Sequence, residues 1–222
     1  MANVFAEGHE IHAKYQRWFR DMEILYGWWH CRSCDYRWWA TCPERCEFCL
    51  DESNIDYAEV PVNDDDLMIA GAGDALVWFE ERLRLVEIKS IGLRSIELDY
   101  PKLYTPYREG RITLDQLWSS VKEPFPTHIR QATLYLHVLK QMDFDVDDII
   151  FVYEFKANQH VKMFTIGYRP EAIANILRGA REVVSAVEQG RSVRRPVWAD
   201  TPQNKTCQRC PYRDACWRNV ER

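Results

Sequence analysis

The sequence predicts a mixed α/β domain in which helices cover a central sheet. Helical and strand-like segments alternate along the 222 residues in the order helix, strands, helix, strands, helix. Hydrophobic residues make up 46% of the chain and aromatic residues 13%, enough for one sizeable core. The chain has no apolar run of about eighteen residues, so no membrane span is expected.

Three long helices follow from the spacing of apolar residues. The first is expected over residues 5–25, where apolar side chains recur at spacings of three and four. The second is expected over residues 128–142. The third is expected over residues 170–189, because Pro170 suits a first helical turn and Gly190 follows the last. These helices are expected to cover the sheet.

Strands are expected where short apolar runs are bounded by turn residues. The predicted strands span residues 56–62, 66–70, 75–79, 83–89, 148–155 and 161–167. Residues 71–74 are expected to form a turn or bulge. Residues 101–126 are rich in proline and predict a loop or lid with a short helix near residues 114–121, and the tail from residue 194 predicts irregular structure.

The most informative segment is the predicted hairpin over residues 75–89. If its turn is centred on residues 81–82, Asp74 lies opposite Lys89 and Leu76 lies opposite Glu87. Paired residues share a face of a hairpin, and so do alternate residues along a strand. Asp74, Glu87 and Lys89 should therefore project to one side. Charged groups in an apolar run are costly to bury unless they bind something.

Two adjacent carboxylates and a lysine form a recognisable chemical set. A Mg²⁺ or Mn²⁺ ion relieves the repulsion between carboxylates and lowers the pKa of a bound water molecule. A nearby lysine can orient that water or stabilise charge on phosphorus. The set therefore suits phosphodiester hydrolysis. The alternative is a structural aspartate at a turn beside a surface Glu–Lys pair.

Four short motifs extend this set and occur in a fixed order. They are GHEIH with Gly8 and His12, GAGD with Asp74, VEIKS with Glu87 and Lys89, and QATLY with Gln131 and Tyr135. The ordered set resembles the PD-(D/E)XK nuclease superfamily, in its RecB-like branch with the CRISPR-associated exonucleases and the AddB-type nucleases. The resemblance implies a restriction-endonuclease-like core with a mixed sheet flanked by helices.

The resemblance also implies roles for the motif residues. His12, Asp74, Glu87 and the backbone carbonyl of Ile88 would bind Mg²⁺ or Mn²⁺. Lys89 would assist the attacking water. Gln131 and Tyr135 would line the site or hold a DNA strand, whereas His9, His128 and His137 lack motif support and are interpreted as structural or surface residues. The implied activity is a metal-dependent deoxyribonuclease, expected to act as an exonuclease on single-stranded or end-frayed DNA in phage or CRISPR-type processing, recombination or repair.

Eight cysteines point to metal binding rather than disulfides, because the chain shows no signal peptide and a cytoplasmic location is expected. Five of them lie between residues 31 and 49. Two CxxC pairs, Cys31/Cys34 and Cys46/Cys49, predict a zinc ribbon. The alternative uses Cys42 with Cys46 as the second pair and leaves Cys49 free.

The remaining cysteines are Cys207, Cys210 and Cys216, near the end of the chain. In the resembled family, a triplet of this spacing joins one distant cysteine in a 4Fe–4S cluster, which assigns the fourth position to Cys42. In that family the lone cysteine precedes the GxxxH helix, whereas here every front cysteine follows it. A second zinc ion, or a histidine or water as fourth ligand, is the alternative.

The predicted organisation is one nuclease domain over residues 1–222, with a ribbon at 28–51 and a cysteine segment at 200–222. The ribbon carries four tryptophans, which either pack on the main body or stack on unpaired bases.

Net charge is −5, yet residues 178–222 hold ten Lys/Arg and five Asp/Glu. This basic tail fits either a phosphate-binding surface or ordinary surface charge. DNA is the expected partner, with protein partners in a recombination or CRISPR complex also expected. The rival functions are a binding module with a vestigial active site and a structure-specific endonuclease.

Overall fold

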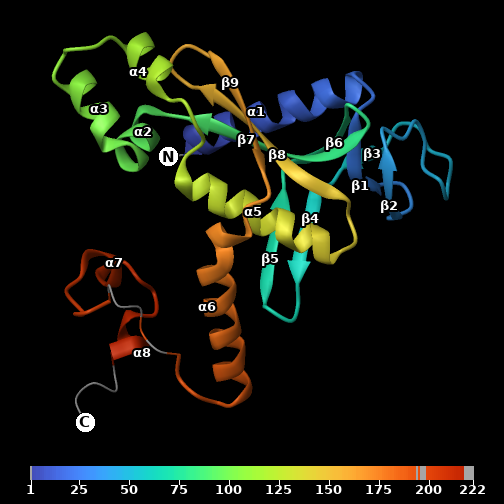
Figure 1. Ribbon diagram of the computed structural model, residues 1–222. Coiled ribbons are helices and arrows are strands. Elements are labelled where there is room, and N and C mark those ends of the chain that lie inside the picture. The colour runs from blue at the N-terminus through green and yellow to red at the C-terminus, as the bar shows by residue number, and fades with distance from the viewer. Residues whose placement is uncertain (1, 194, 196–198, 218–222) are drawn as a thin grey trace. The chain divides into compact units, whose positions relative to one another are not determined.

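The computed structural model describes residues 2–193, 195 and 199–217, in which a mixed sheet runs through the first unit of the chain (Figure 1). Contacts divide the chain into two units, Met1–Leu177 and Arg178–Arg222. The main sheet has the order β2-β1-β6-β7-β8-β9, with β3 paired to β1, and a second sheet joins β4 to β5. The strands are β1 Leu25–Cys31, β2 Arg37–Thr41, β3 Ile55–Tyr57, β4 Val60–Asp64, β5 Ile69–Gly73, β6 Ala75–Phe79, β7 Arg82–Ile91, β8 Val146–Phe155 and β9 Val161–Gly167.

Helices cover both faces of the main sheet. The helices that pack on the sheet are α1 Ala2–Asp21, α2 Leu93–Asp99, α3 Pro101–Arg108, α4 Leu114–Ser120 and α5 Pro126–Gln141. The later helices are α6 Pro170–Glu188 and the short α7 Lys205–Gln208 and α8 Arg213–Trp217. On one face, Ile11 and Tyr15 of α1 pack with Val86 and Ile88 of β7. On the other, α2 to α5 enclose a core that includes Phe151. The mixed α/β class predicted from the sequence is confirmed.

The centre of the sheet is a parallel pair, and this explains its composition. β7 and β8 run parallel, and the other strand pairings in the described part of the chain are antiparallel. Strands buried on both faces read as nearly continuous apolar runs. Residues from Ile149 to Phe155 of β8 are all buried, including Glu154. The carboxylate of Glu154 is held by Lys14 and by the hydroxyl of Tyr15, 2.8 Å away, which fixes α1 on the sheet.

The hairpin of β6 and β7 is present, but its predicted register is wrong by two residues. Ala75 pairs with Val86, and the connection consists of Glu80 and Glu81 rather than a turn centred on Glu81 and Arg82. Both connecting residues have positive φ, 52° and 59°. Such a turn matches the twist of a hairpin, and it usually contains asparagine or glycine. A slip of two residues leaves each side chain on its predicted face.

Three other local predictions are corrected. Residues 71–73, predicted to belong to a turn or bulge, are part of β5, since they pair fully with β4, and the turn lies instead at residues 65–68. Residues 101–126 contain two helices, α3 and α4, rather than a loop with one helix. Proline at the first position of α3 favours a helix start, and Leu103, Tyr104 and Tyr107 pack on the core. The tail contains α7 and α8.

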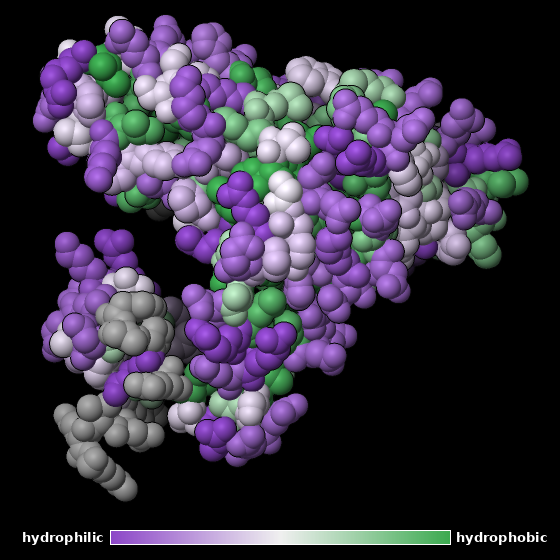
Figure 2. Space-filling model, viewed as in Figure 1, coloured by the Kyte–Doolittle hydropathy of each residue, from purple (hydrophilic) through white to green (hydrophobic). Residues whose placement is uncertain are grey.

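Hydrophilic residues cover most of the surface seen in Figure 2. Exposed large apolar side chains such as Met68, Leu98 and Met163 lie in different parts of the chain, in the β4–β5 turn, α2 and β9 respectively. Within the described residues, no helix combines the length and the apolar character needed to cross a membrane.

Candidate metal and catalytic site

Asp74 is the centre of the site because its carboxylate touches two different elements. It lies between β5 and β6 and is 8% exposed. His12 of α1 places Nδ1 3.2 Å from Asp74 Oδ1, and Gln16, one turn further along α1, donates from Nε2 to the Asp74 carbonyl at 2.9 Å. The hydrogen bond with Asp74 raises the pKa of His12, and burial opposes this shift. The GxxxH and GxxD motifs therefore meet as predicted.

The second oxygen of Asp74 faces β7. Asp74 Oδ2 accepts a hydrogen bond from the Ile88 N–H at 2.7 Å, and Lys89 Nζ lies 3.9 Å away. The N–H and C=O of one strand residue point to the same side in an antiparallel pair. The Ile88 carbonyl is therefore expected to point toward the same edge of β7 as its N–H, and its role as a metal ligand stays a prediction.

Glu87 is an acid buried inside the sheet. Its side chain is 1% exposed, and Oε2 accepts from Lys89 Nζ at 2.7 Å. Oε1 is buried and finds no hydrogen-bond partner among the described residues. Burial and the Asp74 charge raise the pKa of Glu87 to about 7 against the opposing effect of Lys89. Burial lowers the pKa of Lys89, but Glu87 and Asp74 outweigh it and the net shift is upward.

These side chains could hold a divalent cation. A buried carboxylate oxygen without a partner, beside a second carboxylate, is costly in a metal-free protein. Hard oxygen ligands are what Mg²⁺ and Mn²⁺ bind. The sequence therefore identified a group of side chains, His12, Asp74, Glu87 and Lys89, that the fold does bring together.

Sequence reasoning missed Glu59, which belongs to the same neighbourhood. His12, Glu59 and Asp74 each offer a ligand atom, and these atoms lie within 4.8 Å of one another. Burial, followed by the charge of Asp74, raises the pKa of Glu59. The prediction treated residues 56–62 as one strand, but the chain breaks between β3 and β4, where Glu59 has a φ of 62°. An isolated acid in an apolar run was the only available signal.

Gln131 and Tyr135 share one face of α5, as their spacing predicted. Gln131 Nε2 donates to Tyr135 Oη at 3.0 Å. Tyr135 also packs on β5, where a methyl group added to Gly71 would come within 2.9 Å of the ring. Glycine in the GxxD motif therefore makes room for the tyrosine of the QxxxY motif. Gly8 differs, since an added methyl group would meet Ser90 Oγ at an ordinary 3.7 Å.

His128 and His137 have structural partners, in line with the interpretation made from sequence. His137 Nδ1 lies 2.7 Å from Tyr168 Oη. His128 Nδ1 contacts Tyr153 Oη, which accepts from the Phe125 N–H, so the tyrosine hydroxyl is free to donate to a neutral His128. Burial, followed by the charge of Lys89, lowers the pKa of His128 to about 4, although Asp99 opposes the shift.

We expect His128 to make stability depend on pH. The pKa of this histidine is 6.5 in the unfolded chain, whereas in the folded protein it is about 4. Stability should therefore be fully present above pH 6.5 and fall as pH drops toward 4, by about 3 kcal/mol at most. Urea unfolding of wild type and His128→Gln at pH 7 and pH 4.5 measures this. The variant should lose less stability than wild type, and the exposed His160→Gln controls for loss of an imidazole. Equal losses in wild type and His128→Gln would contradict the assignment.

The four cysteines of the two CxxC pairs form a group that could bind a metal such as zinc. Their sulfur atoms all lie within 4.8 Å of one another, with Cys31 Sγ 3.5 Å from Cys49 Sγ and Cys34 Sγ 3.6 Å from Cys46 Sγ. Tetrahedral thiolates about 2.3 Å from zinc have sulfur atoms roughly 3.8 Å apart. Burial raises the pKa of Cys46, but the N–H groups of Cys49 and Phe48 outweigh it and lower the pKa to about 7. This geometry favours the four cysteines of the two CxxC pairs as the metal ligands over the alternative set that includes Cys42.

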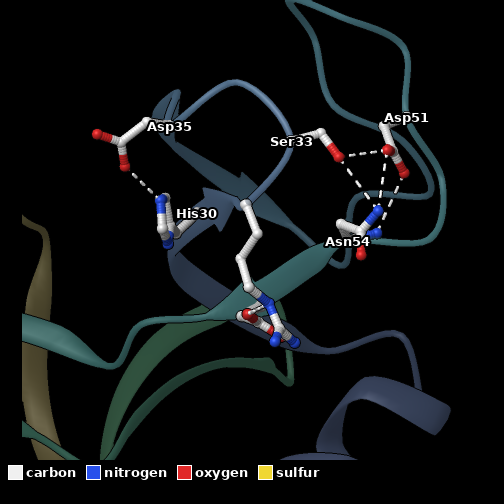
Figure 3. Close-up of polar contacts among 7 residues, drawn as sticks. His30, Ser33, Asp35, Asp51 and Asn54 are labelled. Atoms are coloured by element: carbon white, nitrogen blue, oxygen red, sulfur yellow. Dashed lines mark hydrogen bonds and ion pairs between the residues drawn. The ribbon is translucent and has the colours of Figure 1, made fainter.

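Polar side chains hold the loops around this cysteine group. Figure 3 shows Ser33 and Asn54 turned toward Asp51, which accepts hydrogen bonds from both side chains. The backbone N–H of Ser53 also donates to Asp51, at 2.6 Å. The Ser33 and Asn54 side chains are the main causes that lower the pKa of Asp51. These contacts tie the loop inside the first cysteine pair to the segment that follows the second pair.

Of the four tryptophans in the ribbon, two pack in the core. Trp29 is 0% and Trp38 5% exposed, so these two take the packing role, one of the two roles expected from the sequence. β1 carries Trp29 and also pairs with β6 through Leu25 and Tyr26. The ribbon therefore shares β1 and β2 with the main sheet.

The other four cysteines lie outside this group. Cys42 Sγ lies 3.3 Å from the Leu25 carbonyl oxygen. In the second unit, Cys207 is buried, and its carbonyl accepts from the Cys210 N–H at 3.1 Å. Cys210 and Cys216 are exposed. The assignment of Cys42, Cys207, Cys210 and Cys216 to a 4Fe–4S cluster remains a prediction.

Comparison with known proteins adds no family assignment. A scan against protein-family models gave no match, and a search of curated proteins found no significant relative.

Proposed function

We propose that the protein is a metal-dependent nuclease that hydrolyses phosphodiester bonds in DNA. The observation that carries the proposal is Glu87, a buried carboxylate with one oxygen on Lys89 and the other without a partner among the described residues. A structural ion pair would satisfy both oxygens, because an unpaired buried acceptor costs about 1–3 kcal/mol. The nearby Asp74 adds repulsion that a cation would relieve.

The chain's own residues have separable roles in this proposal. Asp74, Glu87, His12 and the Ile88 carbonyl would hold Mg²⁺ or Mn²⁺, which supplies Lewis acidity and a more acidic water molecule. Lys89 is held within 4 Å of both carboxylates and can orient a nucleophilic water by hydrogen bonding. Tyr135 and Gln131 would contact the DNA strand. Zinc would occupy the four-cysteine group, and the 4Fe–4S cluster would be a second structural group.

Exonuclease action on single-stranded or frayed ends, in phage or CRISPR-type processing, is the version of this function that the motif resemblance favours. The four ordered motifs support it.

Digestion of DNA with defined ends tests the proposal. The purified protein is dialysed against metal-free buffer and incubated with end-labelled linear and with circular single-stranded DNA, in Mn²⁺ or Ca²⁺. We expect linear DNA to be degraded with Mn²⁺, circular DNA to survive, and Ca²⁺ to support no cleavage. Cleavage of circles would show endonuclease action instead. No cleavage of any substrate with Mg²⁺ or Mn²⁺ by folded, zinc-loaded protein would contradict the proposal.

A further inference from the structure

The C-terminal half of α6 and the segment that follows it enclose a hollow of about 390 Å³ within the second unit. Three arginines line this hollow, Arg178 and Arg181 from the helix and Arg191 from the segment after it. Glu182 is the one acid among the described residues of the lining, and all four residues are exposed. The hollow therefore gathers three positive charges against one negative charge, inside the basic tail noted in the sequence.

The turn at the end of α6 folds the chain back toward the helix. Gly190 has a φ of 62°, in the left-handed region that glycine adopts without strain. The Gly190 N–H donates to the Val187 carbonyl at 3.0 Å, and the Arg191 N–H donates to the Ala186 carbonyl at 2.8 Å. These two bonds form a Schellman motif, which ends a helix and redirects the chain. Arg191 and Ser192 thereby reach the hollow that the helix residues line.

A series of side-chain hydrogen bonds orients Arg191 and leaves donors over. Arg191 Nε donates to Gln189 Oε1 at 2.8 Å, and Gln189 Nε2 donates to Ser185 Oγ at 2.9 Å. The Ser185 hydroxyl therefore keeps its own proton for another acceptor. Among the described residues, neither this proton nor the Nη groups of Arg191 have an acceptor. Leftover donors beside gathered positive charge suit an anion.

Helix stability gives no reason for this arrangement. Arg178 and Arg181 are three residues apart, so their like charges adjoin one another and disfavour the helix. Basic side chains stabilise the helix dipole only near its C-terminal turn, and the last turn of α6 contains no basic residue. Glu182 can offset only one of the three positive charges. A bound anion would relieve the repulsion that remains.

We propose that this hollow binds a backbone phosphate of single-stranded DNA through the guanidinium groups of Arg178, Arg181 and Arg191. The Ser185 hydroxyl supplies one further donor. Guanidinium groups match phosphate oxygens with paired N–H···O bonds, and contacts to phosphate carry no base sequence. The inference deepens the proposed function and rests on it for the choice of DNA as the ligand. It assigns the basic tail to phosphate binding rather than to ordinary surface charge.

The salt dependence of DNA binding tests this inference without cleavage. Zinc-loaded protein in Ca²⁺ is titrated into fluorescein-labelled thymidine and adenosine oligonucleotides at several salt concentrations, and binding is followed by anisotropy. One phosphate contact to a single strand contributes about −0.7 to the slope of log K against log salt concentration. Arg181→Gln/Arg191→Gln should reduce the slope by about that amount and weaken binding of both oligonucleotides by about tenfold. Glu182→Gln should tighten binding, because it removes the opposing charge.

Matched controls separate the hollow from net charge. Arg169→Gln removes an exposed arginine that precedes α6 and lies outside the lining, so it should keep the wild-type slope. An unchanged slope and affinity in the folded Arg181→Gln/Arg191→Gln variant would overturn the inference. So would binding of a phosphoserine peptide that depends on Arg181 and Arg191 while the DNA slope does not. Wild type that binds DNA through these arginines but cleaves none with Mn²⁺ would overturn the proposed function and leave this inference standing.

Discussion

Replacing Lys89 by methionine should lower the rate of DNA cleavage by at least about 10³-fold and leave DNA affinity within about threefold. Lys89 Nζ lies 2.7 Å from Glu87 and 3.9 Å from Asp74, the distance range in which one ammonium group can act on both carboxylates. Methionine keeps most of the length and apolar surface of the stem and removes only the charge and its hydrogen bonds. The rate is measured in single turnovers with Mn²⁺, and affinity in Ca²⁺ by fluorescence anisotropy.

The same substitution leaves the Glu87 carboxylate buried without the Lys89 ammonium group. The resulting loss of stability must be separated from the loss of catalysis. Breaking a buried pair costs about 3–5 kcal/mol when the remaining charge stays uncompensated. The double variant Glu87→Gln/Lys89→Met removes both charges, so it should be more stable than Lys89→Met and equally inactive. Lys102→Met removes an exposed positive charge from α3 and should keep the full rate. A wild-type rate in Lys89→Met would contradict the active-site assignment.

The sequence could predict which motif residues meet, because that depends on periodicity. Asp74, Glu87 and Lys89 stayed on one side of the sheet although the predicted hairpin register was wrong by two residues, since alternation along a strand survives an even slip. Gln131 and Tyr135 met because a spacing of four places two residues on one helix face. The register itself depended on a turn formed by two glutamates with positive φ, which composition does not signal.

Glu59 could not be predicted in the same way. It lies in a linker after the three-residue strand β3, and neither a period nor a motif includes it. Its position beside His12 depends on β3 pairing with β1 and on α1 packing across the sheet, which are tertiary contacts. The burial of Glu87 likewise depends on α5 and its neighbours covering β7, so its raised pKa had no sequence signal.

Replacing Cys49 by serine should remove zinc from the protein, whereas replacing Cys42 by serine should leave zinc in place. Cys49 Sγ lies 3.5 Å from Cys31 Sγ within the four-cysteine group, and Cys42 lies outside it beside the Leu25 carbonyl. Zinc per chain, measured by elemental analysis after dialysis against a chelator, should fall from about one to near zero in Cys49→Ser only. The reverse result would establish the alternative partition of the five cysteines, and zinc retained in both variants would contradict a zinc site of four thiolates.

Loss of zinc should also weaken Mn²⁺ binding at the candidate site that contains His12. Structural zinc contributes about 10–16 kcal/mol to folding of small zinc-binding peptides, so the ribbon should unfold in Cys49→Ser. Cys31, Cys46 and Trp38 share one buried cluster with Ile11 and Tyr15 of α1. Unfolding of the ribbon would expose apolar surface under the helix that carries His12. We therefore expect Cys49→Ser to melt at a lower temperature and to bind Mn²⁺ more weakly than Cys42→Ser. A zinc-free variant with unchanged melting temperature and Mn²⁺ affinity would mean that the ribbon is energetically separate from the sheet, despite the strands they share.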